Sequence, residues 1–243
     1  MGERFEQPRA PEAPPKYATP FEMAVYEYEK LAHSYHKSRA DSARKNESEK
    51  SRKQREAEWE ATRLHLKKER IRLKSMAGLQ AELDAYRAEA AGKSEMALAK
   101  EKHHPTRKLE KNMAAADEPK PSPAHVAHHI IPGKGRWIQA AILDVRLSLH
   151  EHGVGINDPL NGIYLPDNKD SRHHWATPKA PVHKELHCWN YEHWIVGALP
   201  DTLKKNAFMN RLSVIKRQLR EGTHPPEIVQ KKDANWKPKY NGF

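Results

Sequence analysis

Cysteine is almost absent from this chain of 243 residues, in which Cys188 is the single example. One thiol excludes an intrachain disulfide framework and any zinc ribbon built on cysteine ligands. If the protein binds a metal ion, histidine and carboxylate side chains must therefore provide the ligands.

Long apolar runs are absent as well. No stretch of the sequence approaches the length of a membrane-spanning helix. The opening residues, Met1-Gly2-Glu3-Arg4-Phe5, lack the apolar core of a signal peptide. We therefore expect a protein that is cytoplasmic at synthesis and has no membrane span.

Hydrophobic residues are scarce, at 37% of the chain, whereas 31% of residues are charged. So polar a chain cannot fill one hydrophobic core over its whole length, and part of it should be extended or disordered. The formal net charge of +11 favours a polyanionic partner. Nucleic acid is the commonest such partner, although an acidic protein or an anionic membrane surface would match the same charge.

The N-terminal part of the chain has a helical pattern. Residues 1–20 contain five prolines and are expected to be a disordered lead-in. Over residues 21–91, apolar residues recur at three- and four-residue steps, which predicts a helical hairpin or a coiled-coil-like arrangement. The charged interval 38–58 is either a solvated helix or disordered. This helical region is either an adaptor for a secretion-machinery component, a chaperone or self-association, or a charged hairpin without a partner.

Composition changes twice after the helical region. Residues 92–123 are rich in Lys, Ala, Glu and Pro, which is typical of an interdomain linker. His103-His104-Pro105 within it is interpreted as incidental, because no apolar residues flank the pair to orient either ring. After residue 120 lie eleven of the 16 histidines and five of the six tryptophans. We therefore place a folded domain at residues 124–224 and a mobile basic tail at residues 225–243.

The predicted domain combines two strands with helices. Short β-branched stretches, each closed by a proline, predict strands at 126–131 and 162–165. Helical periodicity predicts helices at 137–153, 182–199 and 201–220. The expected fold class is α+β, and a strand–strand–helix unit of this kind can clasp one metal ion.

Two adjacent histidines, His128 and His129, stand in the first predicted strand. Neighbouring side chains on a strand point to opposite faces, so the two rings are placed for different tasks. One could bind a metal ion while the other takes a proton from water. His183 and His187, at positions i and i+4, would share one face of the predicted helix and hold a single ion.

In their order along the chain, these motifs resemble the AHH family of the HNH/endonuclease VII superfamily, whose nuclease domains are toxin modules of bacterial polymorphic toxins and secretion-system effectors. The resemblance covers about residues 124–200 and does not include the N-terminal half. It is carried by Ala127-His128-His129, Gly155-Ile156-Asn157-Asp158, Asn161-Gly162-Ile163-Tyr164-Leu165-Pro166, and His183-Lys184-Glu185-Leu186-His187 with Tyr191.

The resemblance implies a ββα-metal fold with added helices, and it implies roles for individual residues. His128, His183 and His187 correspond to ligands of one divalent metal ion, with Mg²⁺, Mn²⁺, Zn²⁺ and Ni²⁺ all open as its identity. His129 corresponds to the general base, and Asn161 to the residue that holds the base or its loop in place. Three histidine ligands would leave an open coordination position for phosphate or water, as a catalytic site requires.

Several residue assignments stay open. His174, in the long loop between Asp167 and Pro181, is an alternative to His183 as a ligand and a weaker candidate for phosphate binding. Lys134 and Arg136 are further weak candidates for substrate phosphates by charge, although loop charges are commonly only solvated.

Two residues within these motifs receive structural interpretations from the sequence pattern. Asn157, in an Asn-Asp-Pro sequence, is interpreted as part of a turn or cap. Tyr191 is interpreted as a core residue, in a segment rich in tryptophan and isoleucine.

The leading functional hypothesis is a metal-dependent DNA endonuclease that acts as an antibacterial toxin. A specialised secretion system would export it into a target cell, and a cognate immunity protein would neutralise it in the producer. An RNA-cleaving toxin is an alternative, because basic charge does not distinguish the two nucleic acids. A non-enzymatic nucleic-acid-binding protein with a structural histidine–metal site, and a scaffold that acts through its helical arm, are the other hypotheses.

Overall fold

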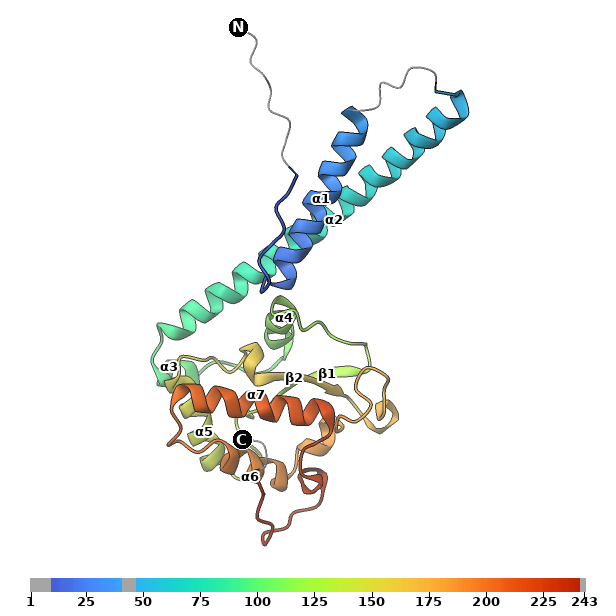
Figure 1. The fold of residues 1–243 in the computed structure, drawn as a ribbon. Helices are drawn as coiled ribbons and strands as arrows, with labels where there is room; N and C mark the ends of the chain where they lie inside the picture. Colours follow the sequence, from blue (N-terminus) through green and yellow to red (C-terminus); the bar gives the residue numbers. More distant parts are fainter. Residues whose placement is uncertain (1–9, 41–46, 241–243) are drawn as a thin grey trace. The chain divides into compact units, whose positions relative to one another are not determined.

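The fold is that of a computed structural model, which describes residues 10–40 and 47–240. Residues 1–9 of the predicted lead-in lie outside this part. The described residues form two compact units that divide between Gly78 and Leu79, and each unit is described by itself. Figure 1 identifies the helices and strands along the chain.

The first unit contains α1 (Pro20–Ala40) and the first part of α2 (Glu49–Ala91). A capping box starts α1: the Thr19 N–H and hydroxyl donate to the Glu22 carboxylate, and the Glu22 N–H donates to the Thr19 hydroxyl. Gly92 follows the last residue of α2, where a helix end was predicted. Among the described helices, none combines the length and the apolar character that crossing a bilayer demands.

In the interval 38–58, for which helix and disorder were both open, residues 38–40 and 49–58 are helical, and residues 41–46 lie outside the described part. The Trp59 indole N–H donates to Ser38 Oγ at 3.0 Å and joins α2 to α1. The described residues on the two sides of this gap therefore belong to a helical pair.

The second unit is built around a sheet of two antiparallel strands, β1 (His125–His129) and β2 (Gly162–Pro166). The register pairs His128 with Ile163. Since paired residues point to the same face and neighbours alternate, His128 lies on the face of Ile163 and His129 on the other. The fold class is α+β, as predicted.

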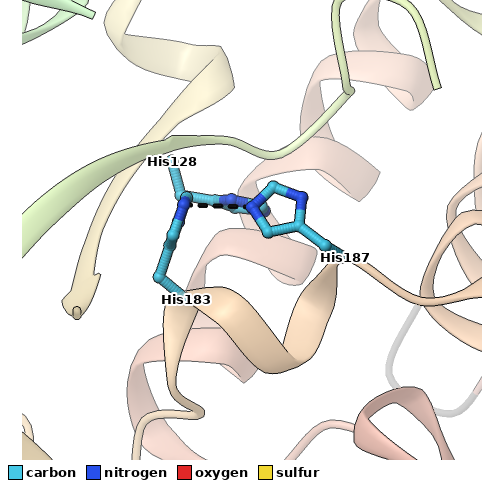
Figure 2. Close-up of side chains that lie close together, drawn as sticks. All are labelled: His128, His183 and His187. Atoms are coloured by element: carbon cyan, nitrogen blue, oxygen red, sulfur yellow. Dashed lines mark hydrogen bonds between the residues drawn. The ribbon is translucent and has the colours of Figure 1, made fainter. Parts of the chain in front are cut away.

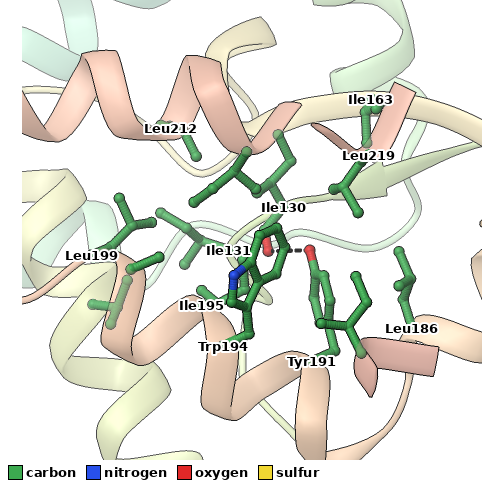
Figure 3. Packing of buried hydrophobic residues seen from close by; sticks show 14 of the residues in the cluster. Ile130, Ile131, Ile163, Leu186, Tyr191, Trp194, Ile195, Leu199, Leu212 and Leu219 are labelled. Atoms are coloured by element: carbon green, nitrogen blue, oxygen red, sulfur yellow. Dashed lines mark hydrogen bonds between the residues drawn. The ribbon is translucent and has the colours of Figure 1, made fainter. Parts of the chain in front are cut away.

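Three helices cover the face of the sheet that carries His128. They are α5 (Gln139–Glu151), which lies between the two strands in the chain, α6 (Trp189–Ala198) and α7 (Lys205–Glu221). Figure 3 shows the apolar core between these elements, with Tyr191 and Trp194 at its centre. Both aromatic side chains are almost completely buried.

Two further helices, α3 (Glu95–Ala99) and α4 (Arg107–Ala115), lie in the interval 92–123 that composition predicted to be a linker. Leu109 and Met113 of α4 are fully buried in a second apolar cluster with Ala127 and Tyr164, on the face of the sheet opposite the main core. The segment is a helix and not a linker because Leu109 and Met113, at positions i and i+4, bury one side of α4 against the sheet.

The predicted helix over residues 182–199 is divided in two. A 3₁₀ turn, η3 (His183–Leu186), comes first, and α6 starts only at Trp189. The helix is interrupted because Cys188 has extended backbone angles, with φ −127° and ψ 164°. The expectation that His183 and His187 share a face of one α-helix is therefore wrong: His183 is the first residue of the 3₁₀ turn, and His187 directly follows its last residue.

The predicted mobile tail packs against the second unit over its described part. Trp236 and Tyr240 lie on the main core. The Asn190 side chain donates to the Lys231 carbonyl at 3.0 Å and accepts the Asp233 N–H at 3.0 Å. Lysine content suggested mobility, but the aromatic residues and Asn190 anchor the segment. Three other 3₁₀ turns connect the elements of this unit: η1 (Pro159–Asn161), η2 (Lys169–Ser171) and η4 (Pro226–Val229).

Candidate metal centre and catalytic pocket

Three of the predicted ligands converge on the inner face of β1. His128 projects from the strand toward His183, the first residue of η3, and His187, which directly follows η3 (Figure 2). One ring nitrogen from each of the three lies within 4.8 Å of the other two. The Nε2 atoms of His183 and His187 are 3.0 Å apart. We call these three residues the histidine trio.

Tyr191 determines which nitrogen of His128 is available. The Tyr191 hydroxyl donates to the Ile130 carbonyl at 2.7 Å, so its oxygen is left to accept. The His128 Nε2–H then donates to that oxygen at 3.1 Å. His128 Nδ1 is therefore the nitrogen with a free lone pair, and the ring is oriented in the way that metal-binding histidines usually are.

The trio is kept neutral by its surroundings. Burial, followed by the neighbouring His183, holds the pKa of His128 well below its ordinary value. Burial, followed by the nearby His187, lowers the pKa of His183 to about 4. Burial and then Arg136 also lower the pKa of His187. All three rings can therefore offer lone pairs at neutral pH.

These features fit a divalent metal ion. Only a neutral imidazole can bind a metal, and three such ligands from two elements leave coordination positions for water or substrate. The buried His183 Nδ1 has no hydrogen-bond partner within the described part of the chain. The nitrogen of His183 that lies next to His187 is instead Nε2, and the fit to an ion rests on the three neutral imidazoles that meet there.

His129 faces the opposite side of β1, toward Asn157. Its Nε2 lies 3.0 Å from Asn157 Oδ1. An amide oxygen only accepts, so His129 Nε2 carries the proton and Nδ1 has the lone pair that a general base needs. Burial above all lowers the pKa of His129 to about 4, although the hydrogen bond to Asn157 opposes the shift. His129 is therefore neutral at pH 7.

Asn161 holds the backbone that follows the base. Its Oδ1 accepts the Ile131 N–H at 2.7 Å, and its Nδ2 donates to the carbonyls of Ile131 and Ile156. The side chain is completely buried. Asn161 was expected to hydrogen-bond either the His129 ring or the loop that carries it. The structure shows that Asn161 bonds to the loop, whereas Asn157 bonds to the ring.

A pocket of about 620 Å³ reaches both the trio and His129. His103 and His104 line it as well, with ring centroids 6.0 Å and 6.3 Å from the ring of His129. The pair that was interpreted as incidental therefore lies beside the candidate base. The His103 ring lies directly on Gly133, where a side-chain β-carbon would come within 2.2 Å of it. A glycine is required there for the two segments to approach so closely.

Lys134 and Arg136 also line the pocket, on the exposed loop before α5. A buried carboxylate, Glu192, shapes this loop by accepting the backbone N–H groups of Arg136, Trp137 and Ile138. The backbone of the loop is thus held next to the pocket, and the exposed Lys134 and Arg136 remain candidates for binding phosphate groups.

His174 lies apart from the trio. Its ring packs edge-on against His125, with centroids 4.7 Å apart, and its Nδ1 accepts the Ala176 N–H. It is not a member of the cluster that could hold a metal ion among the described residues. Of the two alternatives, the geometry therefore favours His183 as the third ligand.

Residues 109–220 match the model of the AHH family, described as a nuclease family of the HNH/ENDO VII superfamily with conserved AHH. The matched segment contains both strands, the Ala127-His128-His129 sequence, the rest of the trio and Asn157. No curated protein and no solved structure matches the chain.

Proposed function

Residues 109–220 belong to the AHH nuclease family of the HNH/ENDO VII superfamily, and on this premise we propose that the chain is a metal-dependent endonuclease that hydrolyses phosphodiester bonds of DNA. The observation that carries the proposal is the meeting of two histidine groups in one pocket. The trio offers neutral nitrogen ligands, and His129 offers a neutral base whose tautomer is set by Asn157.

Each group would have a separate part in the reaction. His129 Nδ1 would accept a proton from water as the water oxygen bonds to phosphorus and the P–O3′ bond breaks. The leaving 3′ oxygen takes its proton from solvent, which yields a 3′ hydroxyl and a 5′ phosphate. Lys134 and Arg136 would hold neighbouring phosphates by charge. The bound ion would stabilise negative charge on the phosphate and the leaving oxygen.

We further propose that the enzyme is an antibacterial toxin that a specialised secretion system exports into a target cell. The family resemblance alone supports this role, whereas the net charge of +11 supports only a polyanionic partner. An immunity protein would protect the producer, and an acidic surface on it would complement the basic loop at the pocket. The N-terminal helical unit would bind a secretion component or a chaperone.

The test is cleavage of a supercoiled plasmid. Protein treated with EDTA should not nick the plasmid, and Mg²⁺, Mn²⁺, Zn²⁺ or Ni²⁺ should restore nicking. His129→Ala should lower the rate by about 10²- to 10⁴-fold while metal binding persists. His65→Ala, which removes an exposed histidine on α2, is the matched control and should cleave like the unchanged protein.

The same variants test the substrate and the toxic role. Cleavage of RNA but not of DNA would replace the proposed substrate. If neither nucleic acid is cleaved, the enzymatic function is excluded, and a nucleic-acid-binding protein with a structural metal site is favoured. In a bacterial host without the immunity protein, production of the unchanged chain should stop growth, whereas production of His129→Ala should not. Equal growth would contradict the toxin role.

A further inference from the structure

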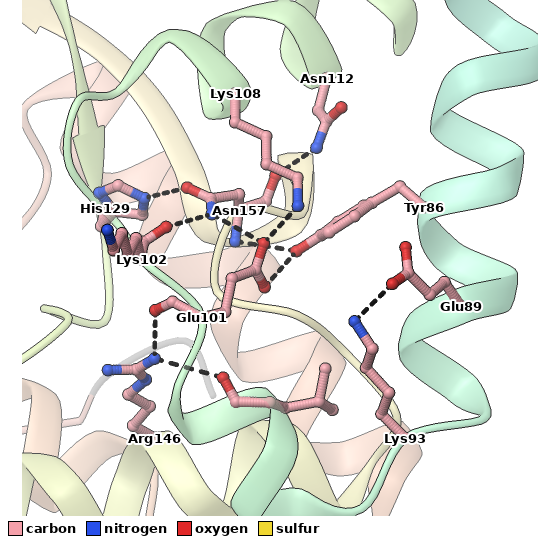
Figure 4. Close-up of polar contacts among 11 residues, drawn as sticks. Tyr86, Glu89, Lys93, Glu101, Lys102, Lys108, Asn112, His129, Arg146 and Asn157 are labelled. Carbon is pink, nitrogen blue, oxygen red and sulfur yellow. Dashed lines mark hydrogen bonds and ion pairs between the residues drawn. The ribbon is translucent and has the colours of Figure 1, made fainter.

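The Asn157 amide that contacts His129 has its orientation fixed from its other end. Its Nδ2 donates to Glu101 Oε1 and to the Lys102 carbonyl, both at 3.0 Å (Figure 4). Both acceptors require the amide nitrogen on their side, so the amide oxygen must face His129. The proton on His129 Nε2 and the lone pair on Nδ1 follow from this arrangement.

Glu101 is itself held by several contacts. The Tyr86 hydroxyl donates to Glu101 Oε2 at 3.0 Å and accepts the Asn157 N–H at 3.1 Å. Lys108 Nζ donates to Glu101 Oε1 at 2.7 Å. The Arg146 guanidinium donates to the Glu101 carbonyl at 3.0 Å. Side chain and backbone of Glu101 are therefore both fixed next to Asn157.

Neither Tyr86 nor Glu101 belongs to the segment that matches the nuclease family, which begins at residue 109. Tyr86 lies near the end of α2, and Glu101 follows α3. We propose that Glu101, aligned by Tyr86, is a positioning residue for cleavage: it fixes the Asn157 amide and thereby the tautomer of His129. This inference rests on the proposed nuclease function, in which His129 is the base.

Loss of Glu101 would have a definite consequence at His129. The Asn157 amide would keep a single acceptor, the Lys102 carbonyl, and would be less firmly held. In molecules where the amide turns over, its nitrogen would donate to His129 Nε2. The ring proton would then sit on Nδ1, where it blocks acceptance of a proton from water. Substrate binding does not involve this step, so kcat should fall and KM should not.

The experiment compares four single variants of the full chain. Glu101→Met removes both carboxylate oxygens, and Glu101→Gln keeps an oxygen that can accept from Asn157. Tyr86→Phe removes the hydroxyl that aligns Glu101. Glu89→Met is the matched control, because Glu89 lies close by in Figure 4 but pairs with Lys93 instead of with this network.

Two readouts are taken from each variant. The first is kcat and KM for plasmid cleavage. The second is the His129 tautomer, read from ¹⁵N shifts of the imidazole nitrogens in slightly alkaline solution and assigned with His129→Ala. Zn²⁺ affinity, measured by calorimetry, shows whether the trio is affected.

Glu101→Met and Tyr86→Phe should lower kcat by about 10- to 100-fold with KM within about twofold, and Nδ1–H signal should emerge at His129. Glu101→Gln should recover most of the rate, and Glu89→Met should match the unchanged protein. If Glu101→Met does not fold, Tyr86→Phe and Glu101→Gln decide by the same criteria.

Unchanged kcat and an unchanged tautomer in the folded variants would overturn the proposal. A lower kcat that accompanies weaker Zn²⁺ binding, with the tautomer intact, would overturn it as well. If the unchanged protein cleaves neither DNA nor RNA, the nuclease proposal fails separately. The NMR readout then decides alone whether Glu101 sets the His129 tautomer.

Discussion

At His128, one phenol group connects the candidate metal centre to the core. The Tyr191 hydroxyl accepts the His128 Nε2–H and donates to the Ile130 carbonyl. His128 and Ile130 are both buried, so water would not take the place of the hydroxyl if it were removed. The same group therefore orients a ligand and satisfies a backbone carbonyl inside the core.

Removal of this hydroxyl gives a prediction for metal binding. Tyr191→Phe should weaken the affinity for a divalent ion by about 10- to 100-fold, since the His128 ring loses the bond that fixes its tautomer. It should also lower the free energy of unfolding by about 1–3 kcal/mol, because the Ile130 carbonyl is left unpaired. Calorimetric titration with Zn²⁺ and chemical denaturation measure the two effects.

Tyr164→Phe is the matched control for Tyr191→Phe. Tyr164 is a buried tyrosine on the face of the sheet away from the trio, in the cluster with Leu109 and Met113. Its replacement should leave the Zn²⁺ affinity unchanged. Equal Zn²⁺ affinity in Tyr191→Phe and the unchanged protein would refute the role given to Tyr191.

At this scale the sequence allowed part of the site to be predicted. Strand alternation was sufficient to separate His128 from His129, because it follows from local geometry. The contacts of Asn157 with His129 and of Tyr191 with His128 bridge 28 and 63 residues of chain. No local pattern carries such pairings, so Asn157 was interpreted as a turn and Tyr191 as core only.

Among the elements, α4 differs most from expectation. Its interval was predicted to be a linker because it is rich in Lys, Glu and Pro. Overall composition does not reveal that the apolar residues of a segment lie on one side of a helix. Leu109 and Met113 form that side, and Asn112 next to them donates to the Asn157 carbonyl at 2.9 Å. The i, i+4 pair was visible in the sequence, but nothing there indicated that β1 and β2 leave a face uncovered.

The packing of α4 can be tested by shortening one side chain. Leu109→Ala should lower the free energy of unfolding by about 2–5 kcal/mol, because Leu109 is fully buried and the cavity would not close completely. Urea denaturation followed by tryptophan fluorescence measures the change. Arg107→Ala, on the exposed side of the same helix, is the control and should change stability little. A linker role for α4 would predict equal stability for both variants.

The element boundaries were likewise predictable where the signal is local and not where it depends on tertiary contacts. The strands were predicted within a few residues from short apolar runs closed by proline, and α5 and α7 from apolar residues at three- and four-residue steps. The break between η3 and α6 was not predicted, since it depends on the extended backbone of Cys188. That break brings His183 and His187 together by a different route from the one their spacing suggested.

Over the whole molecule, buried neutral histidines link stability to pH. Burial is the main cause that lowers the pKa values of four histidines away from the trio: His103, His125, His150 and His224. His150 is representative. Its Nδ1–H donates to the Val154 carbonyl, and its Nε2 accepts from the Arg146 guanidinium, an arrangement that only the neutral ring permits.

Acidification should therefore destabilise the fold. Below the ordinary histidine pKa of 6.5, the unfolded chain binds protons that the folded chain does not, since the folded pKa values are lower. The free energy of unfolding should fall as the pH decreases from about 6.5 toward the folded pKa values. Denaturation of EDTA-treated protein at a series of pH values measures the slope.

His150→Gln isolates one contribution to this slope. The variant should show a shallower fall in stability over the same pH range, because one group that gains a proton on unfolding is gone. His65→Gln, at an exposed position on α2, should retain the full slope. A slope unchanged by His150→Gln would rule out its assigned contribution.

Because side chains alternate between the two faces of β1, the candidate metal ligand and the candidate base lie in different surroundings. His128 depends on Tyr191 and on the segment around η3, whereas His129 depends on Asn157 and on Glu101. In the proposed nuclease, mutations on one side would alter the preferred ion, and mutations on the other side would alter the strength of the base. Evolution, or a protein engineer, can thus adjust metal preference and proton transfer as independent traits within five residues of backbone.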